Sequence, residues 1–465
     1  MRCFVPARLR KSGALAGLLI AAFLSAVSAS AQEQQLSLPD ARELALRAAM
    51  SGRADIALSL SQELLRHDPK DSSAHFARAT SQLSMGNWKK AYKSGRLAFR
   101  YSENPDHKYQ AARLTAIAAM GQERTTATQF WLRRAADLAP GPSERDRVYR
   151  NYQVLQAQNP WRYRFDASIT PSSNVNGGSD TAFNIIDGVP LVGYLSPGAQ
   201  ALSGWVGQTN GALSYRIHKG ERSQTQLHGS AYVKQVRLSE DAKAKAPTFD
   251  ADTLAATSIE LAISHTMALQ QPGSALRFRA GLRDYWQGGS RNYQAALGSV
   301  FYLAPVSSRV SFSGLLGVEE RKYTNGGEGH VTNANLGLSF AMSNGDNLHG
   351  TLQLTDSNNP LAVFDSRAVS GKLTYTLAKP VKSVKLAAGI GASLTDYQNY
   401  SIGFIPVPGG RQDEALFLDL DATFTQVEYA GFSPSLRVRR QRTTSNVSRF
   451  STSEWAVSVG IKSNF

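Results

Sequence analysis

Apolar and polar residues follow two different patterns along this chain, and the change lies at Asn159-Pro160. Before that point apolar residues recur with a period of about 3.6, which is typical of amphipathic helices. After it they alternate with polar residues, which is typical of strands with two different faces. The sequence therefore predicts a helical domain over residues 32–158 and a strand domain over residues 159–465.

The strand domain divides into fourteen alternating segments, an even number, as a closed single-chain bacterial barrel requires. They are 161–170, 204–217, 223–237, 249–267, 275–286, 291–303, 309–323, 330–342, 347–355, 366–377, 383–395, 412–427, 435–442 and 449–465. Short links alternate with longer ones, and the longest follows the first segment. Because such barrels keep short turns in the periplasm, the first strand should rise from there and the helices should lie there. We expect a multidomain α + β protein, with an N-terminal α-solenoid and a C-terminal transmembrane antiparallel β-barrel of about fourteen strands.

The last segment carries the clearest membrane pattern. One face holds Trp455, Val457, Val459 and Ile461, and the segment ends in Phe465. This resembles the C-terminal signal by which bacterial outer-membrane proteins are handed to the barrel assembly machinery. It predicts a barrel in the outer membrane of a Gram-negative bacterium, in contact with outer-membrane lipids.

Charged residues alternate with apolar ones in three of the segments. An Arg on the lipid side at mid-bilayer costs about 2–4 kcal/mol, so these side chains should face the lumen. The predicted lumen charges are Arg277, Arg279, Arg283, Asp419, Asp421, Arg437 and Arg439. Two interpretations stay open: cross-strand ion pairs that stiffen the wall, or a lumen that guides cargo.

The helical domain contains an internal repeat. Gly52 and Gly86 are 34 residues apart, and so are Ala57 and Ala91. This is the period of a tetratricopeptide repeat, and Gly121 marks a less regular third unit. Such repeats stack into a solenoid whose first helices line a concave groove. The expected cargo-groove residues are Ser73, Phe76, Thr80, Lys108, Ala111 and Thr115, although Phe76 is equally well explained as core. Trp88, Phe130 and Trp131 are expected at packing positions.

The composition and the N-terminal residues indicate an exported protein and exclude some other classes of protein. The chain has 42% hydrophobic residues and a mean hydropathy of −0.29, which excludes a helical membrane protein. Residues 1–31 read as a signal peptide, with four cations, an apolar run and Ala29-Ser30-Ala31 as cleavage site. Cleavage would remove Cys3, the single cysteine, and leave +11 of the formal charge of +15. No basic tract accompanies this charge, so we expect no nucleic acid among the partners.

No catalytic or metal-binding pattern stands out. His228, His265, His330 and His349 fall on separate strands, and the histidines of the helical domain have no second ligand at metal spacing. We expect a protein that is not an enzyme and that needs no cofactor or metal.

The whole architecture resembles the surface lipoprotein assembly modulator (Slam) family of outer-membrane translocators. The local element that carries the resemblance is Thr170-Pro171-Ser172-Ser173-Asn174-Val175-Asn176, similar to the Pro-Asp-Ser-Asn-Ile-Asn stretch where that family's barrel begins, with Ser172 in place of Asp. A simple capped loop also explains these residues, because Pro stops the strand and Asn satisfies turn groups. The resemblance implies a barrel that helps a lipoprotein or soluble protein cargo reach the cell surface, with repeats acting in the periplasm.

Two other functions stay open. Porins that export polysaccharides also join such repeats to a barrel, and a glycan path tends to be lined with aromatic and acidic residues. Tyr215, Tyr232, Tyr285, Tyr293 and Tyr323 are candidates for such a lining, or for the interfacial girdles. A passive diffusion porin would leave the repeats without a role.

Overall fold

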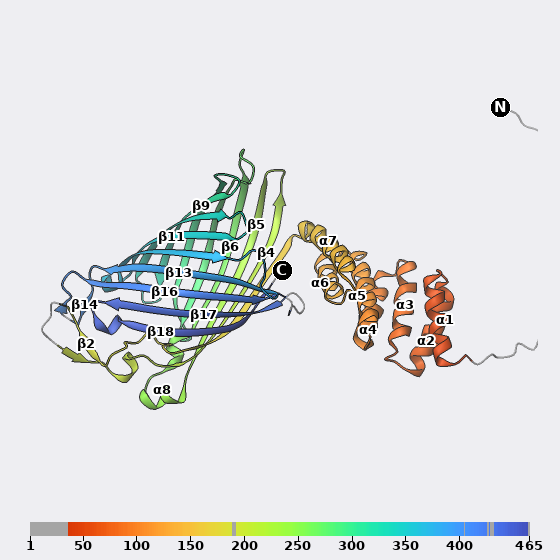
Figure 1. Ribbon diagram of the computed structural model, residues 1–465, viewed down its shortest axis with the longest axis horizontal. Coiled ribbons are helices and arrows are strands. Elements are labelled where there is room, and N and C mark those ends of the chain that lie inside the picture. Colours follow the sequence, from red (N-terminus) through yellow and green to blue (C-terminus); the bar gives the residue numbers. More distant parts are fainter. Residues whose placement is uncertain (1–35, 188–191, 404, 426, 428–431, 464–465) are drawn as a thin grey trace, which may run out of the picture.

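The computed structural model describes residues 36–187, 192–403, 405–425, 427 and 432–463. The predicted signal peptide, Cys3 and Phe465 lie outside these residues. Within them the chain forms a row of helices followed by a closed barrel, and the two units lie end to end (Figure 1). No helix in the described ranges has the length and apolar character to cross a membrane. The expected fold class is confirmed.

In the described residues, seven helices precede the barrel, and they pack as successive antiparallel neighbours. They are α1 (Leu38–Met50), α2 (Ala54–His67), α3 (Ser72–Ser84), α4 (Trp88–Tyr101), α5 (Pro105–Met120), α6 (Thr125–Asp137) and α7 (Pro142–Gln158). Gly52 and Gly86 close the first two turns with φ of 79° and 72°, values that favour glycine. Fully buried alanines such as Ala57, Ala74 and Ala91 let the helices approach closely.

The third repeat differs from the first two at its turn. Gly121 has a right-handed backbone, and Glu123 takes the positive φ instead. The glycine is required for another reason, since a Cβ there would lie 2.4 Å from the Trp88 ring. Trp131 is buried and meets Phe99 edge-on, as a core residue does. Trp88 and Phe130 are partly exposed, so only Trp131 of the three expected packing residues is core.

Fourteen antiparallel strands form the closed barrel. They are β1 (Trp161–Ser172), β4 (Gly204–Lys219), β5 (Ser223–Leu238), β6 (Ala256–Ala268), β7 (Ala275–Gln287), β8 (Ser290–Pro305), β9 (Val310–Tyr323), β10 (Glu328–Ala341), β11 (Asn347–Asn358), β12 (Ser366–Thr376), β13 (Val384–Tyr397), β16 (Arg411–Phe424), β17 (Phe432–Ser445) and β18 (Thr452–Ser463). Each strand pairs with its neighbours in sequence, and β18 closes on β1. Every expected segment overlaps one of these strands.

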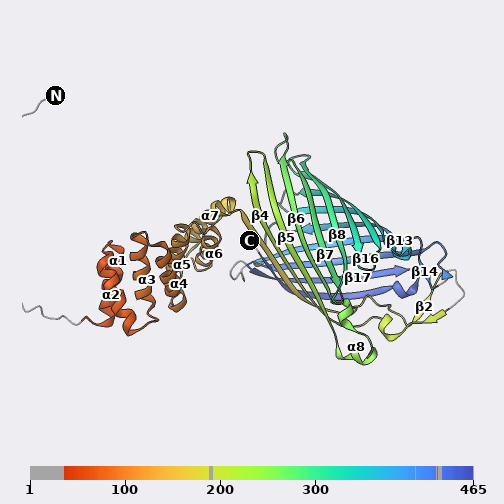
Figure 2. The same cartoon turned by 180° about the vertical axis from the view of Figure 1, so that it is seen from behind.

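Long connections carry the remaining elements, at the barrel end away from the helices (Figure 2). The hairpin β2 (Phe183–Ile185) and β3 (Val192–Tyr194) lies between β1 and β4, α8 (Glu240–Lys245) between β5 and β6, and the hairpin β14 (Ser401–Ile402) and β15 (Ile405–Pro406) between β13 and β16. The alternation of short and long links fails at two places on this end. β7 turns into β8 through Gly288 and Gly289, both with positive φ, and β9 turns into β10 over residues 324–327.

The junction of the first and last strands is the least continuous in the wall. In the described part, β1 pairs with β18 at five positions, against twelve with β4. Pro171 has no N–H to give to the ladder, which confines proline to such junctions and edges. Side chains add bonds here: Thr170 and Ser458 hydroxyls lie 2.7 Å apart, and Ser172 Oγ donates to Glu454 over 2.6 Å.

Candidate functional site: a helical groove and a charged lumen

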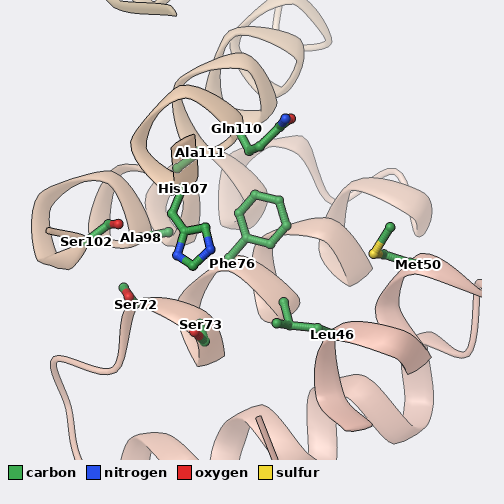
Figure 3. Close-up of a pocket in the computed structure, with 10 residues that line it drawn as sticks. All are labelled: Leu46, Met50, Ser72, Ser73, Phe76, Ala98, Ser102, His107, Gln110 and Ala111. Carbon is green, nitrogen blue, oxygen red and sulfur yellow. The ribbon is translucent and has the colours of Figure 1, made fainter. Parts of the chain in front are cut away.

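An apolar pocket opens between helices α1, α3, α4 and α5 (Figure 3). Its cavity volume is about 180 Å³. Leu46 and Met50 come from α1, Phe76 from α3, and His107 and Gln110 from α5; Ser72, Ser73, Ala98, Ser102 and Ala111 complete the lining. The ring of Phe76 stands at the centre of this group in Figure 3. The pocket is large enough to take one apolar side chain, and its hydroxyl, amide and imidazole groups can bond to a peptide backbone.

The groove residues expected from the sequence divide into two sets. Ser73, Phe76 and Ala111 line the pocket. Thr80 donates its hydroxyl hydrogen to Phe76 O, and neither it nor Lys108 lines the pocket. The prediction that Thr115 faces the groove is wrong, because this residue is fully buried and its hydroxyl donates to Ala111 O.

The error on Thr115 has a steric origin. Gly95 of α4 packs so closely on α5 that a Cβ there would lie 2.4 Å from the Thr115 hydroxyl. Thr115 therefore packs against α4, whereas His107, Gln110 and Ala111, which lie nearer the start of α5, line the pocket. The pattern of the second and third repeats does not predict Leu46 and Met50, because both lie on α1, which precedes those repeats. The signal that could have found them is their spacing, because Leu46 and Met50 are four residues apart and so lie on one face of α1.

The joint between helices and barrel is built from specific bonds. Asn159 is buried, donates to Gln129 Oε1 over 2.7 Å and accepts from the Trp161 N–H at 3.0 Å. Arg216 of β4 donates to the carbonyl of Gln158 at the end of α7, over 2.9 Å. The side chain of Phe130, exposed in part, lines a surface hollow at the same joint. These contacts hold the last helices against the barrel end where β1 begins.

Lumen-facing charges gather in two clusters. The first spans β6 to β9: Glu260 accepts from Arg279 and, at 2.7 Å, from Arg283, which also donates to Glu319 over 2.8 Å. Arg321 joins it, 2.9 Å from Glu319. Arg277 stands apart from this cluster, 3.2 Å from Thr266 Oγ1 and over the Phe301 ring.

The second cluster spans β12 to β18. Asp419 lies 2.6 Å from Lys372 Nζ and 3.3 Å from Arg439 Nε. Asp421 lies 2.8 Å from Arg437 Nε and 3.8 Å from Lys462 Nζ. Both arginines sit directly opposite these aspartates in the strand register. The structure thus places six of the seven expected lumen charges in cross-strand ion pairs, and Arg277 is the exception. Cations outnumber carboxylates seven to four over the two clusters, so the wall carries net positive charge.

Tyrosines form a row on the same inner face. Tyr285 stacks on Tyr293 with centroids 5.0 Å apart, and Tyr293 meets Tyr323 at 5.4 Å. Arg321 lies over the Tyr293 ring, which is buried. Tyr215 instead faces outward, 4.6 Å from the Trp161 ring, as an interfacial girdle residue does.

The residues at the end of β1, from Ser172 to Asn176, close the first long connection by hydrogen bonds. Asn174 exchanges hydrogen bonds with Gly178, and Asn176 donates to the carbonyls of Gly198 and Gln200 and accepts from Leu202 N–H. Ser172 Oγ accepts from Asn174 N–H at 3.0 Å. These residues therefore tie the two ends of residues 173–203 together.

The outward residues of β18 (Trp455, Val457, Val459 and Ile461) are all exposed, as lipid-facing side chains are.

His228, His265 and His349 each bond to one hydroxyl group. His330 differs, because its Nδ1 lies 2.6 Å from Glu320 Oε1 and its Nε2 lies 2.8 Å from Thr332 Oγ1. His228 Nε2 lies 2.7 Å from Ser264 Oγ, and His349 Nδ1 lies 2.6 Å from Ser339 Oγ. Among the described residues, no carboxylate bonds to the other ring nitrogen of either, as a triad would need. The same residues hold no group of three or more His, Cys, Asp or Glu arranged for a metal ion.

No protein-family model and no curated protein sequence matches the chain. OmpT, an outer-membrane protein of Vibrio cholerae, is 7% identical with a TM-score of 0.34, and the match covers 66% of this chain and 97% of that one. The type III secretion translocator chaperone SycD of Yersinia enterocolitica is 19% identical with a TM-score of 0.24, over 27% of this chain and 88% of its own. These scores are too low to argue from, so the fold rests on the strand order and helix pairing above.

Proposed function

We propose that this chain moves a protein or lipoprotein cargo from the periplasm to the cell surface. The helices hold the cargo in the periplasm and the barrel serves as the conduit. A barrel joined to helical repeats supports a transport role across the outer membrane, and the surface lipoprotein assembly modulators are the family this proposal draws on. The observation that carries it is the apolar pocket around Phe76, on a helical unit fixed at the barrel end where β1 begins.

The pocket suits a protein cargo for a physical reason. Burying one Leu or Phe side chain contributes about 1.5–3 kcal/mol, enough to select an extended segment without holding it irreversibly. Short connections dominate the barrel end nearest the helices, which supports a periplasmic position for them. The specific bonds of Asn159 and Arg216 keep the pocket at a fixed place relative to that end.

A surface-display assay tests the proposal. The chain is coexpressed with candidate secreted proteins and lipoproteins of its host, and arrival outside is measured by protease shaving of intact cells. We expect a cargo that reaches the surface only with the full chain, and less of it with Phe76→Glu, which puts a charge into the pocket. Thr80→Ala, one turn further along the same helix and outside the pocket, should leave export unchanged.

A truncation separates the roles of the two units. Deleting residues 36–158 should leave a folded, heat-modifiable barrel that no longer exports. Unchanged export by that barrel would contradict the role given to the helices.

Export of a polysaccharide is the second candidate, and the row of Tyr285, Tyr293 and Tyr323 favours it. Aromatic faces stack on sugar rings, and these three lie on the lumen side. If deletion of the gene removes an extracellular glycan and leaves all surface proteins in place, this second function replaces the first.

A further inference from the structure

Tryptophans on the outer wall of the barrel occur beside arginines at the end with the long connections. Trp205 of β4 is paired in register with Arg237 of β5. Trp286 of β7 is paired with Arg291 of β8, whose guanidinium lies 5.6 Å from the indole centroid. The third pair, Arg440 of β17 and Trp455 of β18, has a separation of 5.0 Å. We refer to these as the three Arg–Trp pairs.

All three pairs lie on the lipid side of the wall. Trp205 and Trp455 are 52% and 54% exposed. Trp455 alternates with the exposed Val457 and Val459, and Trp286 shares its face with exposed Leu282. Residues of the lumen clusters occupy the opposite face of β7, β17 and β18, because successive side chains alternate between faces.

The opposite end of the barrel is built differently. Trp161, the first residue of β1, meets the rings of Tyr163 and Tyr215. Its neighbour Arg162 points to the lumen by the alternation of β1. Tryptophan thus marks both boundaries of the membrane, as aromatic belts do. In the described part of the barrel wall, it is paired with arginine at the end with the long connections only.

The arginines have unused hydrogen-bonding capacity. No carboxylate in the described residues lies within ion-pair distance of Arg237 or Arg440, while Arg291 has Asp284 at 3.4 Å. A guanidinium that lies over an indole, as those of Arg291 and Arg440 do, keeps its in-plane N–H donors free, and these match the geometry of a phosphate oxygen pair. Arg237 is placed beside Trp205 by the strand register. At a membrane boundary, such a cation recognises anionic lipid headgroups. The aromatic ring beside it sits at headgroup depth, and the flanking Leu and Val side chains contact acyl chains.

From this charge complementarity we propose that the three Arg–Trp pairs bind the phosphate groups of lipid A, the phosphorylated glycolipid of the outer leaflet. The inference does not depend on which cargo the barrel exports. It assigns three lipid sites around the wall, one between β4 and β5, one between β7 and β8, and one between β17 and β18.

Native mass spectrometry of the full chain in detergent tests the proposal. Three probes are compared: lipid A with both phosphates, the same lipid with its phosphates removed, and inorganic phosphate. We expect up to three equivalents of the phosphorylated lipid, bound at least about 10-fold more tightly than the dephosphorylated one. Each single variant, Arg237→Gln, Arg291→Gln or Arg440→Gln, should remove one equivalent, and the triple variant should bind both lipids alike.

Arg309→Gln is the matched control, because Arg309 is an exposed arginine in the short turn between β8 and β9. It should leave lipid binding unchanged, and all variants should keep heat-modifiable migration. Equal affinity for the two lipids, or full binding by the single variants, overturns the proposal. Displacement of the lipid by inorganic phosphate at similar concentration overturns it too, since the site would then recognise free phosphate and not a lipid.

Discussion

Replacing Asp419 by Asn should destabilise the barrel far more than the same change at Asp421. Asp419 is the carboxylate between Lys372 and Arg439 on the lumen wall, and its side chain is 4% exposed. The Asp421 side chain, with its own two cations, is 21% exposed. Asn keeps the shape of Asp and removes the charge, so the comparison isolates the electrostatic contribution.

The expected magnitude follows from burial. Removing one partner of a buried ion pair costs about 3–5 kcal/mol, because the other charge stays buried without compensation. Lys372 and Arg439 remain 33% and 39% exposed, so lumen water takes up part of that cost. We expect a loss of about 2–3 kcal/mol in the free energy of unfolding for Asp419→Asn. For Asp421→Asn we expect about 1 kcal/mol or less, as for exposed pairs.

Denaturant unfolding of the full chain in detergent, followed by the loss of heat-modifiable migration and of strand signal, measures these differences. Adding Lys372→Met to Asp419→Asn gives a double-mutant cycle. The double variant should lose less than the sum of the single losses, since one cation, Arg439, and not two then lacks the Asp419 carboxylate. Equal losses for the two aspartate variants, or strictly additive losses in the cycle, would refute the reasoning from burial.

Three further predictions concern other parts of the chain. Burial holds the pKa of His75 below its ordinary 6.5. The unfolded helices therefore take up a proton at a higher pH than the folded ones, and their stability falls as the pH drops from 7.5 through 6.5. His75→Gln should flatten this pH dependence, as measured by helix melting at 222 nm. Asn176→Ala removes the side-chain bonds that close the first long connection, so residues 173–203 should become protease-sensitive on intact cells while the barrel stays folded. Removing Phe465 should lower the amount of heat-modifiable barrel in the outer membrane, and normal insertion would show that this residue is no assembly signal.

The barrel was predictable because each strand has enough residues for its alternation to be unambiguous. In β16, Leu416, Leu418 and Leu420 face the lipid and Asp419 and Asp421 face the lumen, so the face of every side chain follows from its position. A one-residue shift would reverse all of them, which is why the register is strongly determined.

Contacts between helices could not be predicted in the same way. Thr115 and His107 both lie on α5, and the pattern of that helix does not say which face meets α4. The close approach at Gly95 decides it, and that approach depends on a glycine in another helix. The small hairpins in the long connections were also missed, since two- and three-residue strands leave no period to detect.

The attachment of the helices to β1 determines how the molecule bears mechanical load. β1 is paired with β4 along all twelve of its residues, from Trp161 to Ser172. A pull on the helices along the strand direction loads those pairs together, in shear, whereas a sideways pull at Trp161 would peel them apart one at a time. The bonds of Asn159 and Arg216 brace that starting point against peeling. Tension on a chain held by the helices is therefore spread over the length of β1.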